Sequence, residues 1–159
     1  SIAADPGNAP LLASGIVQPF NPDGSPAGSH PEFNPHPMQG WSPDFISDLA
    51  YQALENDHID GVQPVSGPQA IDMARALARR EGIFCGITGG ATFAAALKIA
   101  ETAPSGAKIL AMLPDTGERY LSTPLFEGVP AEMTDEEKAL SNSTPGARFD
   151  ESGTPAKAA

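Results

Sequence analysis

The chain has 159 residues, of which 40% are hydrophobic, and a formal net charge of −11. This length suffices for one domain with a core, but the hydrophobic fraction is somewhat low, so we expect part of the chain to lie outside the packed region. The negative charge argues against nucleic acid or an anionic membrane surface as a partner, and no apolar run approaches the ~20 residues of a membrane span.

The sequence contains few cysteines and histidines. The single cysteine, Cys85, excludes an internal disulfide and any cysteine-based metal cluster, and its apolar surroundings favour a buried, inert thiol. The three histidines, His30, His36 and His58, have no metal-ligand spacing. With no visible signal peptide, we expect a soluble protein of a reducing compartment, the cytoplasm, without a bound metal.

The first 40 residues are rich in proline, with eight of the 17 in the chain. The chain opens at Ser1 with an apolar stub that closes on Asp5-Pro6. This stub is typical of the end of a strand, and we expect the chain to be a fragment or one half of a larger protein. Because proline removes a hydrogen-bond donor and fixes φ, the rest of residues 1–40 is predicted to be a long irregular loop, either functional or partly mobile.

Two helix starts follow the loop. Ser42-Pro43-Asp44 has the composition of a helix N-terminus, and apolar spacing extends that helix to about Glu55. A short strand is expected within 59–65. Ser66-Gly-Pro-Gln69 then reads as a capping box for a second helix. The arginines at the carboxyl end of that helix suit the helix dipole better than they suit a phosphate site.

The stretch 81–98 reads as a strand over 83–85, a tight glycine turn and an alanine-rich helix from about Ala91. Gly86, Gly89 and Gly90 permit positive φ and close backbone approach, and Thr88 is the small hydroxyl residue in the turn. The spacing does not fit a G-x-G-x-x-G dinucleotide site. A G-x-S-x-G nucleophile elbow fails because every histidine precedes Thr88. A cofactor-ring contact and a plain turn with a buried hydroxyl both remain open.

Residues 108–113 form a continuous apolar run, typical of a strand covered on both faces. Alternation of strands and helices through 59–113 predicts an α/β fold with a mostly parallel sheet, and 114–117 should form a second turn at the same sheet edge. Thr134-Asp-Glu-Glu137 is a further capping box, predicting a helix near 134–141. Residues from about 145 onward have the composition of a disordered tail.

Three segments together resemble one family. Residues 81–91, E-G-I-F-C-G-I-T-G-G-A, are similar to the E-G-I-x-x-G-I-S-[SAG]-G-A segment of cysteine synthases. Residues 113–126 are similar to that family's L-P-D-[ST]-G-E-R-Y-L-S-T-x-L-F, and residues 36–40 to its H-x-[IL]-Q-G. Asp5-Pro6 is similar to the V-[ED]-P that ends a core strand. The resemblance covers about residues 1–126.

This resemblance implies part of a pyridoxal-phosphate enzyme of fold type II. The fold would be a three-layer αβα arrangement with a mostly parallel sheet, loop-rich over 1–40, an α/β core over 41–126 and an acidic, partly disordered tail over 127–159. The implied reaction makes cysteine from O-acetylserine and sulfide. A homodimer is implied too, and docking of serine acetyltransferase is a further possibility.

The resemblance also implies the site residues. Thr88 would take the place of the family's serine that meets the pyridine nitrogen of pyridoxal 5'-phosphate. A neutral hydroxyl there leaves the ring a weaker electron sink than a carboxylate would, which favours loss of a β-substituent over racemisation. The other implied residues are Gly86, Gly89, Pro114 and Asp115 beside the cofactor, and Gln39 and Gly40 at the mouth of the site.

The departures from the family pattern are equally informative. The family's Schiff-base lysine, its substrate-carboxylate loop and its phosphate cup are absent from these residues, so no catalytic residue is assigned and we expect the chain alone to be inactive. A paralogue of the cystathionine β-synthase type is an alternative, because it shares the glycine turn. A non-catalytic remnant of the fold is a third possibility.

Overall fold

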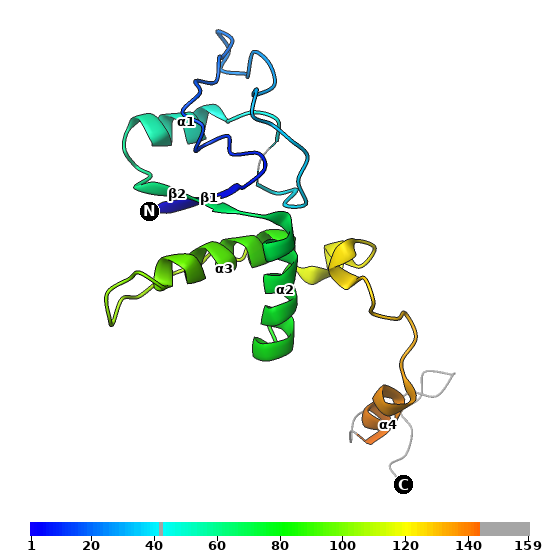
Figure 1. The fold of residues 1–159 in the computed structure, drawn as a ribbon. Helices are drawn as coiled ribbons and strands as arrows, with labels where there is room; N and C mark the ends of the chain where they lie inside the picture. The colour runs from blue at the N-terminus through cyan, green and yellow to red at the C-terminus, as the bar shows by residue number, and fades with distance from the viewer. Residues whose placement is uncertain (42, 144–159) are drawn as a thin grey trace. The chain divides into compact units, whose positions relative to one another are not determined.

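The computed structural model describes residues 1–41 and 43–143. Ser1–Glu127 forms one compact unit, and a second begins at Gly128. In the first unit, β1 (Ile2–Pro6) and β2 (Gly61–Val65) form a parallel pair in which Ile2 is opposite Gly61 and Pro6 opposite Val65. The predicted strand ending at Asp5-Pro6 and the strand within 59–65 are therefore confirmed, and they lie side by side (Figure 1).

The second helix agrees closely with its sequence signals. Helix α2 (Gly67–Glu81) starts at Ser66, whose hydroxyl accepts from the Gln69 amide while the Gln69 side chain accepts from the Ser66 amide. It ends at Gly82, which adopts the left-handed conformation with φ of 68°. Local hydrogen bonds fix both ends, and the capping box at the start was predicted from its local motif.

Helices α2 and α3 (Ile87–Ala100) pack directly on each other through small residues (Figure 1). A Cβ at Gly90 would collide with the Ala70 carbonyl and lie 2.7 Å from the Ala74 amide nitrogen. Ala70, Ala74 and Ala91 are almost fully buried at this contact. The alanine-rich sequence is therefore explained by a close helix crossing that larger side chains would prevent.

The first helix starts later than predicted. Helix α1 spans Asp48–Glu55 with Ser47 as its N-cap, whereas the predicted start, Ser42, lies outside the described residues. Ile46 is buried against Leu11, and its amide donates to Gln18 Oε1 at 3.3 Å. These contacts with the long loop hold the chain before residue 47 in a non-helical path, which a local capping signal at Ser42 could not reveal.

Two predicted strands are not formed, so the expected three-layer arrangement is reduced here to one parallel pair with helices. Residues 83–85 contribute only an isolated antiparallel bridge between Cys85 and Thr116. Residues 108–113 form no strand, and Leu110 and Met112 are 99% and 72% exposed. An apolar strand needs neighbours along its edges, and among the described residues no strand pairs with 108–113, although Leu113 packs against the core.

The long loop after β1 is held by buried polar groups. The buried Asp5 carboxylate accepts from the Leu12 and Ala13 amides through Oδ2, at 3.0 and 3.2 Å, and Oδ1 has no hydrogen-bond partner. Burial raises the pKa of Asp5, while these two amides and, less strongly, His30 oppose the rise. The loop is irregular as predicted, but its first turn is tied to the strand.

The segment after Asp115 contains two short helices, and the second of them contacts α2. The short 3-10 helices η1 (Gly117–Tyr120) and η2 (Pro124–Phe126) follow Asp115. Arg75 Nε and Nη2 donate to the Leu125 and Pro124 carbonyls at 2.8 and 2.6 Å. One arginine of α2 therefore fixes η2, and Arg79 and Arg80 lie in the last turn as the dipole argument predicted.

The second unit contains helix α4 (Asp135–Ser143), which confirms the helix expected near 134–141. The Thr134 hydroxyl accepts from the Glu137 amide at 3.2 Å, and the Glu137 carboxylate accepts from the Thr134 amide at 2.7 Å. The tail expected to be disordered lies outside the described residues. Within the described part of the chain, no helix combines the length and apolarity that crossing a membrane requires.

The buried Asp5 carboxyl predicts a distinctive pH dependence. Because the folded state raises the pKa of Asp5 above its ordinary 3.8, the folded state binds the proton more tightly. The associated stability is full below pH 3.8 and is lost as pH rises through the higher pKa of the folded state. We expect the free energy of unfolding of the wild type to fall relative to that of Asp5→Asn as pH rises above this value.

Urea unfolding of both proteins between pH 3 and pH 7 measures this difference. Asp72→Asn, which removes an exposed acid on α2, controls for the loss of one negative charge. A wild-type minus Asp5→Asn difference that stays constant with pH, or rises with it, would contradict the expectation.

Candidate functional site

The amino-terminal end of α3 is capped by a residue from a distant segment. Its N-cap, Gly86, has no side chain to accept the first amides. The carboxylate of Asp115 takes that role: Oδ2 accepts from the Thr88 amide at 3.1 Å and Oδ1 from the Gly89 amide at 2.7 Å. A negative group at this end is also favoured by the helix dipole.

Gly86 and Gly89 leave the space that the Asp115 carboxylate occupies. The tight glycine turn predicted before Ala91 is wrong. A Cβ at Gly86 would overlap Asp115 and the Tyr120 ring, and one at Gly89 would lie 2.9 Å from Asp115 Oδ1. Neither glycine has positive φ, and the helix starts at Ile87 rather than near Ala91. Of the two glycine properties invoked from sequence, close approach is the one that the structure uses.

The two predicted turns lie together. The Gly86 amide donates to the Asp115 carbonyl at 3.4 Å, and the Gly117 amide donates to the Phe84 carbonyl at 3.2 Å. This short antiparallel contact presents the Asp115 side chain to the start of α3. Residues 84–86 and 115–117 are therefore joined as neighbours, although neither forms a regular strand.

The hydroxyl of Thr88 is buried and has no hydrogen-bond partner. Thr88 is 1% exposed, and a Cβ built on Gly40 would lie 3.6 Å from its Oγ1. Tyr120 lies on the other side: burial and then the Asp115 carboxylate raise the pKa of its phenol, and the nearby Thr88 hydroxyl lowers it. The Thr88 and Tyr120 hydroxyls are thus neighbours, but their geometry falls short of a hydrogen bond.

The structure brings most of the predicted site residues together. Gly86, Thr88, Gly89 and Asp115 share the start of α3, and Gly40 lies against Thr88. Gln39 and Pro114 are exposed beside them in sequence. Tyr120 was not among the predicted site residues. Its position in the G-E-R-Y-L-S-T segment was the sequence feature that could have identified it as a site residue.

Cys85 is buried, as the sequence predicted. Cys85 is 4% exposed, and its thiol pKa is raised, first by burial and then by the charge of Asp115. A thiol with a raised pKa is a poor nucleophile at neutral pH. Among the described residues, no group of histidine, cysteine or acidic side chains could hold a metal ion.

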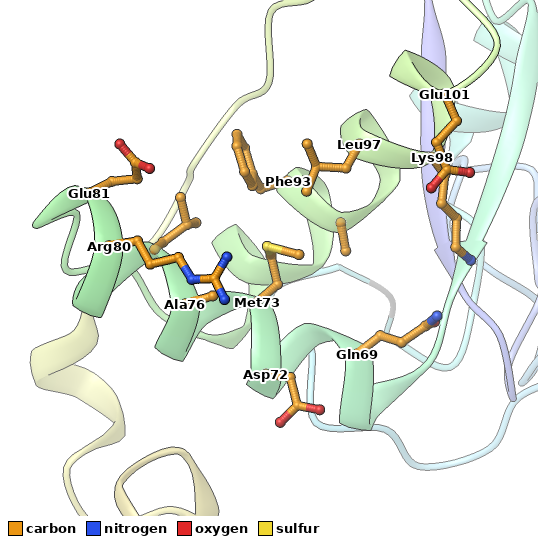
Figure 2. A pocket seen from close by; sticks show the side chains of 12 residues that line it. Gln69, Asp72, Met73, Ala76, Arg80, Glu81, Phe93, Leu97, Lys98 and Glu101 are labelled. Atoms are coloured by element: carbon orange, nitrogen blue, oxygen red, sulfur yellow. The ribbon is translucent and has the colours of Figure 1, made fainter.

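A separate hollow lies between α2 and α3, away from Thr88. Met73 from α2 and Phe93 and Leu97 from α3 point into it, with charged side chains such as Arg80 and Glu101 around the edge (Figure 2). None of the predicted site residues lines this hollow. We therefore place the candidate site at the start of α3.

Residues 1–115 match the model of one protein family, described as pyridoxal-phosphate dependent enzyme. The chain belongs to this family. Its relatives are of the cysteine synthase type. O-ureido-L-serine synthase of Streptomyces lavendulae is 45% identical over 128 residues, which cover 80% of this chain and 33% of that protein. Cysteine synthase of Staphylococcus aureus (strain Mu50 / ATCC 700699) is 38% identical over 107 residues, covering 67% of this chain and 33% of that enzyme.

The solved structures agree with this assignment. The crystal structure of O-ureido-L-serine synthase superposes with a TM-score of 0.66 at 43% identity, covering 87% of this chain and 37% of that one. The present chain spans about a third of the length of the curated relatives it matches.

The two glycines that face the site, Gly86 and Gly40, should differ in how much stability they lose on substitution by alanine. Gly86→Ala forces a Cβ into Asp115 and Tyr120, and overpacking of this kind costs roughly 1–3 kcal/mol. Gly40→Ala meets only ordinary contacts with Thr88, the nearest at 3.6 Å, so we expect a change within about 1 kcal/mol. Thermal unfolding of the two variants followed by circular dichroism measures the difference. Equal losses in both variants would show that Asp115 does not occupy the space over Gly86.

Proposed function

We propose that this chain contributes the cofactor-ring contact of a pyridoxal-phosphate enzyme that replaces the β-substituent of a serine derivative. The leading reaction is formation of cysteine from O-acetylserine and sulfide. The observation that carries the proposal is the Thr88 hydroxyl, which is buried without a partner at the start of α3. Family membership supports it.

The residues present fit the cofactor. A buried hydroxyl without a partner costs free energy, and a heterocyclic nitrogen is a partner of suitable chemistry for it. Bound pyridoxal phosphate would supply the electron sink for loss of the β-substituent. Thr88 would hold its ring nitrogen through a neutral group, Gly86 and Gly89 would keep side chains out of the way, and Pro114 would line the ring.

Residues 39 and 40 would control access to this contact. Gly40 covers the Thr88 hydroxyl, which exposes almost no surface, so a ring can reach the hydroxyl only if this segment shifts. Gln39 is exposed beside it and would face the substrate at the mouth. A homodimer and docking of serine acetyltransferase remain predictions from the family resemblance.

A second candidate reaction is formation of O-ureido-L-serine. The specific observation favouring it is the 45% identity with the Streptomyces lavendulae enzyme, compared with 38% for the Staphylococcus aureus cysteine synthase. Both are replacements at the β-carbon of serine, so the same role of Thr88 serves either reaction.

The test uses a hybrid in which this chain's counterparts replace the 128 matched residues of O-ureido-L-serine synthase. In that hybrid, Thr88→Val should weaken cofactor binding roughly ten- to a hundredfold, because an unpaired buried polar group costs ~1–3 kcal/mol. Thr88→Ser keeps the hydroxyl and should bind nearly as the parent does. Fluorescence titration gives the dissociation constant, and the ¹⁵N shift of the labelled ring nitrogen reports the hydrogen bond.

Thr92→Val is the matched control. Thr92 lies one turn further along α3, and its hydroxyl donates to the Thr88 carbonyl at 3.1 Å, so the variant removes a threonine hydroxyl of the same helix away from the ring. The chain of 159 residues alone should give no absorption band that borohydride reduces. If Thr88→Val binds the cofactor with the parent's affinity and ¹⁵N shift, Thr88 is a structural residue and the proposal fails.

A further inference from the structure

We propose that Asp115 is a positioning residue: its carboxylate fixes the first turn of α3 so that the Thr88 hydroxyl stays free for a ligand. The inference deepens the proposed function and rests on it. It also revises the sequence-based expectation for Asp115, which placed this residue against the cofactor.

The first support is the geometry of the carboxylate. Its two oxygens accept from two consecutive amides, those of Thr88 at 3.1 Å and Gly89 at 2.7 Å. Two bonds to adjacent peptide groups fix both the position and the rotation of this turn, whereas a single bond would allow pivoting. The direction of the Thr88 Cα–Cβ bond is then determined by a residue 27 positions away.

The second support is how Asp115 engages the groups around Thr88. Each carboxylate oxygen accepts from one amide, and the Thr88 hydroxyl forms no hydrogen bond to either oxygen. Tyr120 is 9% exposed and lies beside the same carboxylate, which raises its phenol pKa after burial does. Both hydroxyls therefore lie next to the carboxylate, and that of Thr88 has no hydrogen-bond partner.

The third support is the absence of a side chain at positions 86 and 89, which lie against the carboxylate. Only glycine fits at positions 86 and 89, because a Cβ at either would meet Asp115 within 2.9 Å. Residues 86–89, G-I-T-G, therefore form a close-fitting site for the Asp115 carboxylate, with Thr88 between the two glycines. Because the carboxylate fits closely here and bonds the Thr88 amide, a shift of the carboxylate should move Thr88.

The experiment measures the Thr88 side chain in the 159-residue chain by NMR. The N–Cγ2 and C′–Cγ2 couplings of Thr88 report its χ1 rotamer, and hydrogen exchange reports the Gly89 amide. We expect one rotamer in the wild type and averaged couplings in Asp115→Asn, whose amide offers only one acceptor oxygen. Exchange of the Gly89 amide should rise at least about tenfold, the equivalent of ~1.4 kcal/mol.

Ser66→Ala is the matched control, because it removes the cap of α2 as Asp115→Asn removes that of α3. Both variants should lower the melting temperature, but only Asp115→Asn should change the Thr88 couplings, measured well below both transitions. If Asp115→Asn leaves those couplings unchanged, Asp115 is merely a cap and the proposal is overturned.

Asp115→Glu covers the case in which Asp115→Asn does not fold. It retains a negative charge at the helix end, but its longer side chain cannot occupy the same close-fitting site, so averaged Thr88 couplings are expected and wild-type couplings would overturn the proposal. The proposals for Asp115 and for Thr88 can be refuted separately. A hybrid in which Thr88→Val binds cofactor normally removes the proposed function, while unchanged couplings in the Asp115 variants remove only the positioning role.

Discussion

The pair of hydrogen bonds from the start of α3 to the Asp115 carboxylate is the constraint on which the site depends. It joins two segments 27 residues apart and caps a helix whose own N-cap is a glycine. A helix end left with unsatisfied amides would be costly in a buried position, and here the Thr88 and Gly89 amides are both buried and satisfied. The two glycines make room for the carboxylate, and the short contact between 84–86 and 115–117 brings it to the start of α3.

The rest of the first unit positions that helix. Gly90 lets α3 approach α2 closely, Ser66 and Gly82 fix the ends of α2, and Arg75 ties η2 to it. By contrast, residues 108–113 precede Asp115 as an extended apolar segment with Leu110 fully exposed. Its composition is that of a covered strand, but among the described residues no strand pairs with it, and Leu113 at its end packs against the core.

The parts of the fold that sequence predicted well are those set by neighbouring residues. The capping boxes at Ser66 and Thr134 each act within four residues, so a local pattern contains all the necessary information. The start of α1 was misplaced because Ile46 and Gln18, 28 residues apart, compete with the local signal at Ser42. The strand over 108–113 failed for a related reason, since a strand depends on partners elsewhere.

The glycine segment shows the same limit at the candidate site. Sequence identified Thr88 and its glycines as a place of close approach, but it assigned the approach to a ligand and a turn. The structure assigns it to Asp115 and a helix end. Two glycines three apart cannot indicate what comes close to them, because any compact group satisfies the requirement. The similarity of 113–126 to a known segment placed Asp115 near Thr88, but not the contact between them.

The Thr88 hydroxyl distinguishes a site from a well-packed helix end. Thr92 and Thr123 on this unit bond their hydroxyls to backbone carbonyls, whereas Thr88 is the only buried hydroxyl among residues 1–41 and 43–143 without a partner. An unpaired buried polar group costs ~1–3 kcal/mol, and a valine of the same shape would avoid that cost. A ligand that accepts from this hydroxyl, as proposed above, would remove that cost. Gly40 lies against the hydroxyl and has no side chain there, so a small shift of this segment would make room for such a ligand.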